Sequence, residues 1–217
     1  MKHFTKLCLI LTLLFLPAVS SADLPKFLER YDQLTPGKYV DKYYYDSQTL
    51  HEKSYLTIQV KDVDVCYIKG EQTLKPKDAA TTLKRDFQEA ARASQVSRFF
   101  LFEESSFAKA SLELAITEQS SGAPIGRFLF PGLGVGHPYF RIEGRIVDLE
   151  TKHVLAAFTH FKAGRGIWFL KDIGGRGDSS VLKDMYADAA SDIVKEIGDS
   201  FGYISEILQD GTPFKYN

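Results

Sequence analysis

Two amphipathic helical patterns, one in the middle of the chain and one near its end, most constrain the fold. Residues 77–94 and 179–201 both carry apolar side chains at spacings of three and four. This spacing places the apolar residues on one face of a helix, and that face must be buried against another element. The apolar stripes are Ala79, Leu83, Phe87, Ala90 and Ala91 in the first helix, and Leu182, Met185, Tyr186, Ala189, Ile193 and Ile197 in the second.

Strand-like segments supply a sheet against which the two helices can pack. Alternating or short apolar runs predict strands at residues 39–45, 54–68, 98–102 and 110–119. Residues 139–149 and 153–163 are joined by the polar turn 150–152, so this pair predicts a β-hairpin. A short helix is also predicted over residues 24–34.

The order of these elements predicts an α+β fold. Helices and strands alternate only in part, which favours one mainly antiparallel or mixed sheet packed against two long helices over a doubly wound parallel sheet. No linker, internal repeat or low-complexity tract divides the chain. Residues 23–217 are therefore predicted to form a single domain.

The first 22 residues have the order of a secretory signal. Lys2 and Lys6 precede an apolar run that ends at Leu16, and small residues follow as far as Ala22. About ten apolar residues are too few for a membrane-spanning helix, which needs roughly twenty. We expect cleavage after Ala22 and a mature domain in the periplasm or outside the cell, with no transmembrane helix. The alternative is a retained membrane anchor.

Charge and cysteine content restrict the partners further. The formal net charge of the whole chain is −1, and loss of a leader with two lysines and no acid leaves the mature chain near −3. Nucleic-acid partners, which require a clustered basic surface, are therefore not expected. Without Cys8, the mature chain keeps only Cys66, which lies in the apolar run 63–68. We expect this thiol to be buried; the alternative is intermolecular pairing.

Two regions resemble a known family. Residues 27–34, with the sequence FLERYDQL, are followed by Pro36 and Gly37 and resemble the opening of an uncharacterised bacterial envelope family, the domain of unknown function numbered thirty-three-thirteen. Residues 127–136 and 146–155 are similar to the same family. The resemblance implies an α/β domain in the periplasm or at the outer membrane of a Gram-negative cell, with no established enzyme activity. Many relatives are similar to lipoproteins, but Cys8 precedes the apolar run, which argues against a lipid anchor at this cysteine.

The first glycine-rich segment contains Gly132, Gly134 and Gly136. A dinucleotide-binding motif with related spacing must follow a strand and open a helix, whereas His137-Pro138 and a predicted strand follow here. We therefore expect no cofactor. The segment forms either a close-packed turn or an exposed apolar patch that meets a partner or a lipid surface. The candidate contact residues are Phe128, Phe130, Leu133, Val135 and, in the second glycine-rich segment, Trp168, whose alternative is burial against the last helix.

The second glycine-rich segment, residues 164–177, directly precedes the last predicted helix. Free backbone N–H groups at a helix N-terminus can bind an anion. The candidate anion-binding residues are Lys171, Gly175, Arg176 and Gly177. The alternative is that Asp178 or Ser179 caps the helix, because a capping side chain occupies the same donors.

No arrangement of residues in the sequence indicates catalysis or a metal site. His153 and His160 lie seven residues apart on one predicted strand and so point to opposite faces. The Gly-x-Ser-x-Gly motif of a nucleophile elbow is absent from the sequence. The leading hypothesis is an exported, non-catalytic protein that binds an envelope protein or another envelope component through its glycine-rich segments. The rival hypothesis is a small-molecule or anion binder, with or without hydrolytic activity, and a third is peripheral membrane attachment through residues 128–135.

Overall fold

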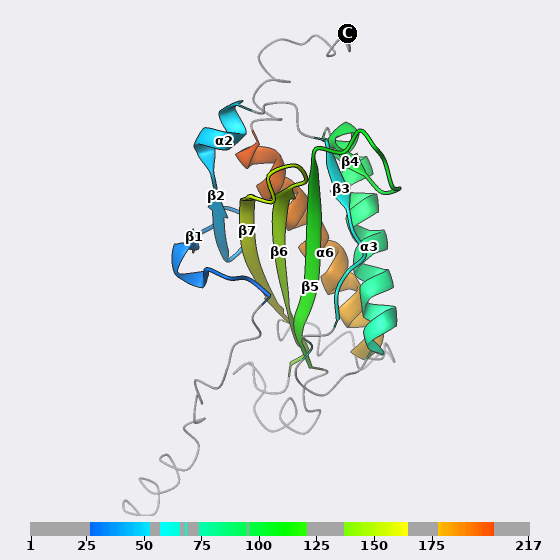
Figure 1. The fold of residues 1–217 in the computed structure, drawn as a ribbon. Coiled ribbons are helices and arrows are strands. Elements are labelled where there is room, and N and C mark those ends of the chain that lie inside the picture. The colour runs from blue at the N-terminus through cyan, green and yellow to red at the C-terminus, as the bar shows by residue number, and fades with distance from the viewer. Residues whose placement is uncertain are drawn as a thin grey trace, which may run out of the picture.

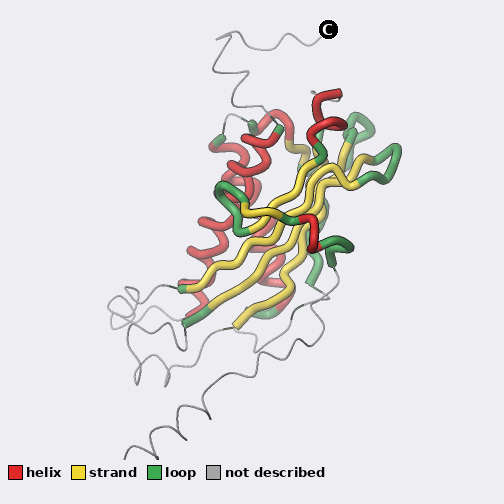
Figure 2. The backbone as a smooth tube through the Cα atoms, turned by 90° about the vertical axis from the view of Figure 1, so that its left-hand side faces the viewer, coloured by secondary structure: helices red, strands yellow, loops and turns green. Residues whose placement is uncertain are grey.

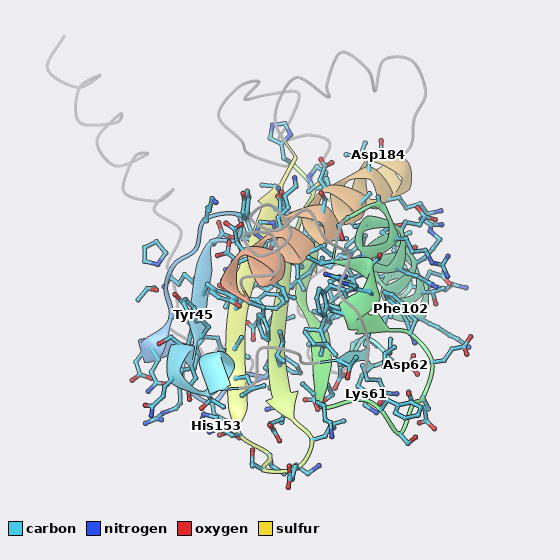
Figure 3. All side chains as sticks on the ribbon, turned by 90° about the horizontal axis from the view of Figure 1, so that it is seen from above. Tyr45, Lys61, Asp62, Phe102, His153 and Asp184 are labelled. Carbon is cyan, nitrogen blue, oxygen red and sulfur yellow. The ribbon has the colours of Figure 1, made fainter. Side chains whose placement is uncertain are left out.

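The computed structural model describes residues 27–52, 57–65, 68, 74–94, 96–120, 137–164 and 178–201. One seven-stranded sheet is covered on one face by α3 (Pro76–Ala93) and α6 (Asp178–Ser200), as Figure 1 shows. Figure 2 shows both long helices on the same side of the sheet, and in Figure 3 they lie next to each other. The predicted α+β architecture with two long helices is confirmed.

The sheet is mixed. Its strands are β1 (Thr35–Pro36), β2 (Lys42–Tyr45), β3 (Ile58–Val60), β4 (Phe100–Leu101), β5 (Ala110–Ser120), β6 (Tyr139–Asp148) and β7 (Val154–Ala163). They lie in the order β1-β2-β7-β6-β5-β3-β4. The β5-β6-β7 centre and the β1-β2-β7 side are antiparallel, whereas β3 is parallel to both of its neighbours. The predicted hairpin is confirmed as β6 and β7.

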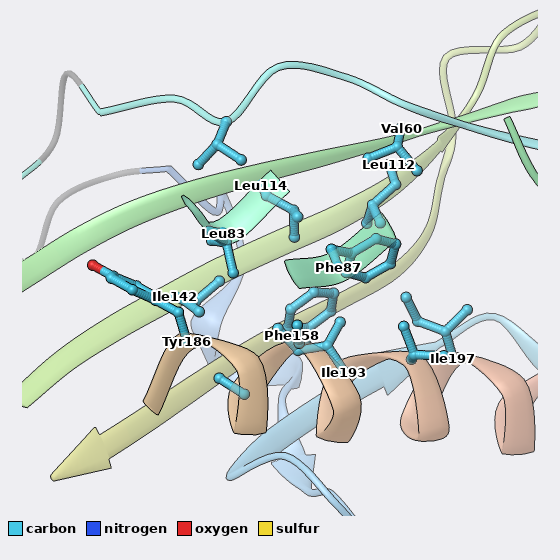
Figure 4. Close-up of a cluster of buried hydrophobic side chains, with 14 of the residues drawn as sticks. Val60, Leu83, Phe87, Leu112, Leu114, Ile142, Phe158, Tyr186, Ile193 and Ile197 are labelled. Carbon is cyan, nitrogen blue, oxygen red and sulfur yellow. The ribbon is translucent and has the colours of Figure 1, made fainter. Parts of the chain in front are cut away.

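The core lies between the sheet and the two helices (Figure 4). Leu83 and Phe87 of α3 and Tyr186 of α6 are fully buried, as their positions in the apolar stripes predict. The ring of Tyr186 stacks on Phe140 of β6 with centroids 4.3 Å apart. Burial of these apolar faces is the main force that holds the helices on the sheet.

A glycine in the middle of β6 makes room for one large side chain of the core. A Cβ atom at Gly144 would lie only 2.2 Å from Cζ of Phe158 on β7. Since no real Cβ atom approaches a carbon so closely, the Phe158 ring occupies the space that a side chain at position 144 would need.

The predicted helix over residues 24–34 is wrong for its described part. Only η1 (Tyr31–Gln33), a single 3-10 turn, forms there. Phe27, Leu28 and Leu34 are buried against the helix-free face of the sheet, where Ala115 and Ala157 lie. Residues 27–34, the N-terminal strap, therefore bury their apolar side chains on the sheet without a helix. A helix this short gains little stability of its own.

An additional helix, α2 (Ser47–Glu52), lies between the first two strands predicted from the sequence. The Asp46 carboxylate accepts hydrogen bonds from both the backbone N–H and the hydroxyl of Thr49. This is the bonding pattern of an N-terminal cap, and it explains why a helix begins here.

At the β4 side of the sheet, the described parts of two predicted strands form shorter strands than expected. Within the predicted strand 54–68, the structure assigns β3 to three residues and adds an isolated bridge between Asp64 and Ala115. Within 98–102, the 3-10 turn η2 (Ser97–Phe99) precedes the two-residue β4. Both strands lie at the β4 side of the sheet, away from the β5-β6-β7 centre.

Candidate functional site

The two glycine-rich segments are attached at the same end of the sheet. β5 ends at Ser120, which pairs with Tyr139 at the start of β6, and Tyr139 pairs with Ala163 at the end of β7. The backbone N–H of Gly164 also donates a 2.8 Å hydrogen bond to the carbonyl of Pro138. The described ends of both segments are therefore direct neighbours, although more than 20 residues separate them in the sequence.

All site residues predicted from the sequence lie outside the described residues. These are Phe128, Phe130, Leu133, Val135, Trp168, Lys171, Gly175, Arg176 and Gly177, and Cys66 lies outside them as well. Their contact or anion-binding roles stay predictions. The described residues at the attachment points show which surface adjoins them.

That surface is an aromatic patch on the helix-free face, formed by Tyr139, Arg141, Phe161 and Glu118. The rings of Tyr139 and Phe161 have centroids 5.7 Å apart, and the Arg141 guanidinium lies 5.6 Å from the Phe161 ring. Arg141 also lies 3.3 Å from the Glu118 carboxylate, so the patch is close to neutral. Phe161 is 39 % exposed. Exposed aromatic rings beside arginine are typical of protein interfaces.

A buried carboxylate lies next to the patch in the middle of β6. Glu143 is only 1 % exposed, because the N-terminal strap crosses over it. It accepts a 2.6 Å hydrogen bond from the hydroxyl of Tyr31 and a 3.3 Å hydrogen bond from Thr117. Burial raises the pKa of Glu143, and burial together with this carboxylate raises the pKa of Tyr31. The hydrogen bond between the two groups joins the strap to the middle of the sheet.

A polar pocket of about 400 Å³ lies between the strap and the β3 side of the sheet. Lys61 and Asp62, labelled in Figure 3, are part of its rim. Inside it, Arg145 donates a 2.7 Å hydrogen bond to Glu113 and covers the ring of Phe27. Within the described ranges, no group of three or more histidine, cysteine, aspartate or glutamate side chains could hold a metal ion.

A second, mainly apolar groove of about 480 Å³ runs between α3 and α6. Ala90 and Ala187 are among the small residues that line it, and Asp86 lies at its α3 side. One oxygen of Asp86 accepts hydrogen bonds from Arg85, whereas the other is buried with no partner in the part of the chain that the structure describes. Burial raises the pKa of this carboxyl group.

The two histidines of the hairpin have different surroundings. His153 is exposed at the turn before β7, and its Nε2 lies 2.9 Å from Asp46. His160 is buried against α6, with Asp192 as its neighbour there. The two side chains therefore have separate carboxylate partners.

Reasoning from the sequence did not identify Glu143, Asp86 or His160 as buried ionisable residues. A signal was present for His160, because it continues the period-two series of helix-facing residues that contains Ala156 and Phe158. No comparable signal exists for Glu143. Its burial results from the N-terminal strap, a tertiary contact that the pattern of β6 does not encode.

No protein-family model and no curated protein matches this chain. Membership of the family numbered thirty-three-thirteen therefore stays a prediction. No described helix has the length and apolar character needed to cross a membrane.

Several solved structures are similar to the chain. The PelC dodecamer from Paraburkholderia phytofirmans is 17 % identical, with a TM-score of 0.41 over 62 % of this chain and 86 % of that one. Protein XCC0632 from Xanthomonas campestris, of the family DUF330, is 10 % identical, with a TM-score of 0.38 over 72 % and 89 % of the two chains. The hypothetical protein CT253 from Chlamydia trachomatis is 11 % identical, with a TM-score of 0.36 over 69 % and 97 %.

Proposed function

We propose that this chain is an exported, non-catalytic protein of the bacterial cell envelope that binds a protein or another envelope component. The contact surface consists of the two glycine-rich segments and the adjoining aromatic patch. One observation carries the proposal: the row of Ser120, Tyr139 and Ala163 brings the attachment points of both segments to one end of the sheet.

The composition of this surface supports a macromolecular partner. The first glycine-rich segment contributes Phe128, Phe130 and Leu133, and the second contributes Trp168. Phe161 of the aromatic patch adds a ring that is already exposed. Large aromatic side chains that are desolvated at the centre of an interface supply much of the binding energy. The expected leader peptide supports a location outside the cytoplasm.

Site-specific photo-cross-linking in cells that naturally make the protein tests the proposal. A photoreactive phenylalanine analogue replaces Phe161 in one variant and Phe107 in the matched control. Phe107 is 79 % exposed and lies near the start of β5, at the opposite end of the sheet. We expect a discrete adduct from position 161 and none from position 107.

The result also distinguishes the classes of partner. A discrete protein or glycan adduct at position 161 supports the proposal. Equal adducts at both positions, or none at position 161, would contradict it. Adducts with lipid alone would replace it with peripheral membrane attachment.

The rival hypothesis of anion binding has one supporting observation. α6 begins at Asp178, so the second glycine-rich segment does open a helix. A thermal-shift titration with inorganic phosphate tests this hypothesis, because ligand at a hundred times its dissociation constant stabilises a protein by about 2.7 kcal/mol. An unchanged melting temperature for the wild-type protein would count against it.

A further inference from the structure

His160 of β7 is a buried imidazole between two carboxylates. Its side chain is 5 % exposed, with Nδ1 at 3.6 Å from Asp41 and Nε2 at 3.6 Å from Asp192. Both distances are too long for a hydrogen bond, and neither ring nitrogen has another partner among the described residues. The imidazole ring is therefore buried beside two carboxylates without forming a hydrogen bond to either.

Three elements meet at this site. Asp41 belongs to residues 37–41, the connection between β1 and β2, and Asp192 belongs to α6. The connection is held on one side by Glu196 of α6, whose carboxylate accepts hydrogen bonds from the backbone N–H groups of Lys38, Tyr39 and Val40. On the other side, the Asp41 carboxylate accepts a hydrogen bond from the backbone N–H of Phe161. His160 lies where these two attachments converge.

Asp192, one of the two carboxylates beside His160, already has two cations close to it. Lys162 of β7 lies 2.6 Å from Asp192, and Lys195 of α6 lies 3.9 Å from its other oxygen. Across the β6–β7 pair, the neighbour of His160 is the apolar residue Ile142. A proton on His160 would therefore place a third cation near Asp192 in a buried site, with Asp41 as the carboxylate left to offset the cost of burial.

We propose that protonation of His160 controls whether residues 37–41 stay bound to α6. The ring is neutral while this connection is docked on α6. Its protonation favours an open form in which the connection has detached. This device is independent of the proposed binding function. It uses the cluster of His160, Asp41 and Asp192 and the contacts of Glu196.

The direction of the pH response follows from the surroundings of the ring. Burial first, and then Lys162, lower the pKa of His160 below its usual 6.5, while Asp41 and Asp192 oppose this effect. The docked form therefore binds fewer protons than an open form in which the imidazole meets water. The free energy of opening must then fall as the pH decreases below about 6.5.

Hydrogen exchange on the full mature chain measures the opening directly. The reporters are the amides of Lys38, Tyr39, Val40 and Phe161, with rates divided by the intrinsic rate at each pH. Between pH 7.5 and pH 5.5, we expect their protection to fall by up to about tenfold in the wild-type protein. Protection at Leu114, in the middle of β5, should change less, because the opening is local.

Two variants separate His160 from other titrating groups. His160→Gln should abolish the additional loss of protection at low pH. His153→Gln, the matched control at the exposed histidine, should retain it. An equal pH response in His160→Gln and wild type, or an equal loss at Leu114, would overturn the proposal.

A second measurement does not require a variant to fold. NMR titration of the imidazole in the wild-type protein should give a pKa below 6.5 for His160. A pKa at or above 6.5 would refute the proposal that protonation detaches residues 37–41, because protonation would then favour the docked form.

Discussion

The hydroxyl of Tyr31 and the carboxylate of Glu143 are joined by a 2.6 Å hydrogen bond, although 112 positions separate them in the sequence. This bond fixes the N-terminal strap over the middle of the helix-free face. Phe27, Leu28 and Leu34 add an apolar contact with Ala115 and Ala157. The strap is thus part of the folded domain, even though it forms no regular helix or strand over most of its length.

Tyr31→Phe should lower the free energy of unfolding by about 1–3 kcal/mol, because it leaves the buried Glu143 carboxyl with Thr117 as its remaining donor. Tyr45→Phe is the matched control, since Tyr45 is 46 % exposed, and its effect should stay within about 0.5 kcal/mol. Urea denaturation monitored by circular dichroism measures both. Equal effects of the two substitutions would show that the Tyr31 hydrogen bond does not stabilise the strap.

Glu143→Gln should change how stability depends on pH. Because burial raises the pKa of Glu143 above its usual 4.5, the folded state binds more protons than the unfolded state between these two values. The stabilising contribution of protonated Glu143 is therefore fully present below pH 4.5 and is lost as the pH rises through the folded-state pKa. The stability of Glu143→Gln relative to wild type should increase over this range and then level off. A series of urea titrations from pH 4 to pH 8 tests this, and a constant or decreasing difference would contradict it.

Gly144→Ala should destabilise the protein by about 1–3 kcal/mol, because the new methyl group would meet the Phe158 ring. Gly164→Ala is the control, since its Cβ would lie 3.2 Å from Pro138 and should cost less. The double variant Gly144→Ala, Phe158→Leu should recover part of the loss, which a double-mutant cycle measures. Strict additivity of the two substitutions would mean that the steric contact is not the cause.

Phe87→Ala should reduce the free energy of unfolding by about 3–5 kcal/mol. The ring is fully buried and makes an edge-to-face contact with Phe100 at 5.3 Å, so its removal leaves a cavity between α3 and the sheet. Phe107→Ala removes the same side chain from an exposed position and should change stability by less than about 0.5 kcal/mol. Guanidinium denaturation of both variants provides the comparison, and similar losses would contradict the assignment of the core.

The sequence predicted the two long helices and the central hairpin closely. The predicted helices 77–94 and 179–201 correspond to Pro76–Ala93 and Asp178–Ser200. These elements have long periodic patterns, and their own residues determine which face is buried. The fold class follows from them.

The strap and the order of the strands could not be predicted in the same way. Phe27, Leu28, Tyr31 and Leu34 have helical spacing, but the sheet beneath them determines their conformation. The parallel position of β3 between β4 and β5 likewise depends on pairing with distant strands. Local patterns do not specify such pairing.

The candidate site was predictable only in part. Its glycine-rich segments were evident from composition, whereas the aromatic patch depends on the register that places Tyr139 near Phe161. The buried positions of Glu143 and His160 depend on contacts with the strap and with α6, which involve residues far away in the sequence.

The strand order has a consequence for biogenesis. β2 finds its long partner only in β7, more than 100 residues later, and β3 requires β5. A chain that becomes available N-terminus first cannot complete this sheet until β7, which ends at Ala163, is present. The C-terminal third of the chain is therefore needed before the molecule can reach its native form, whatever has already folded before it.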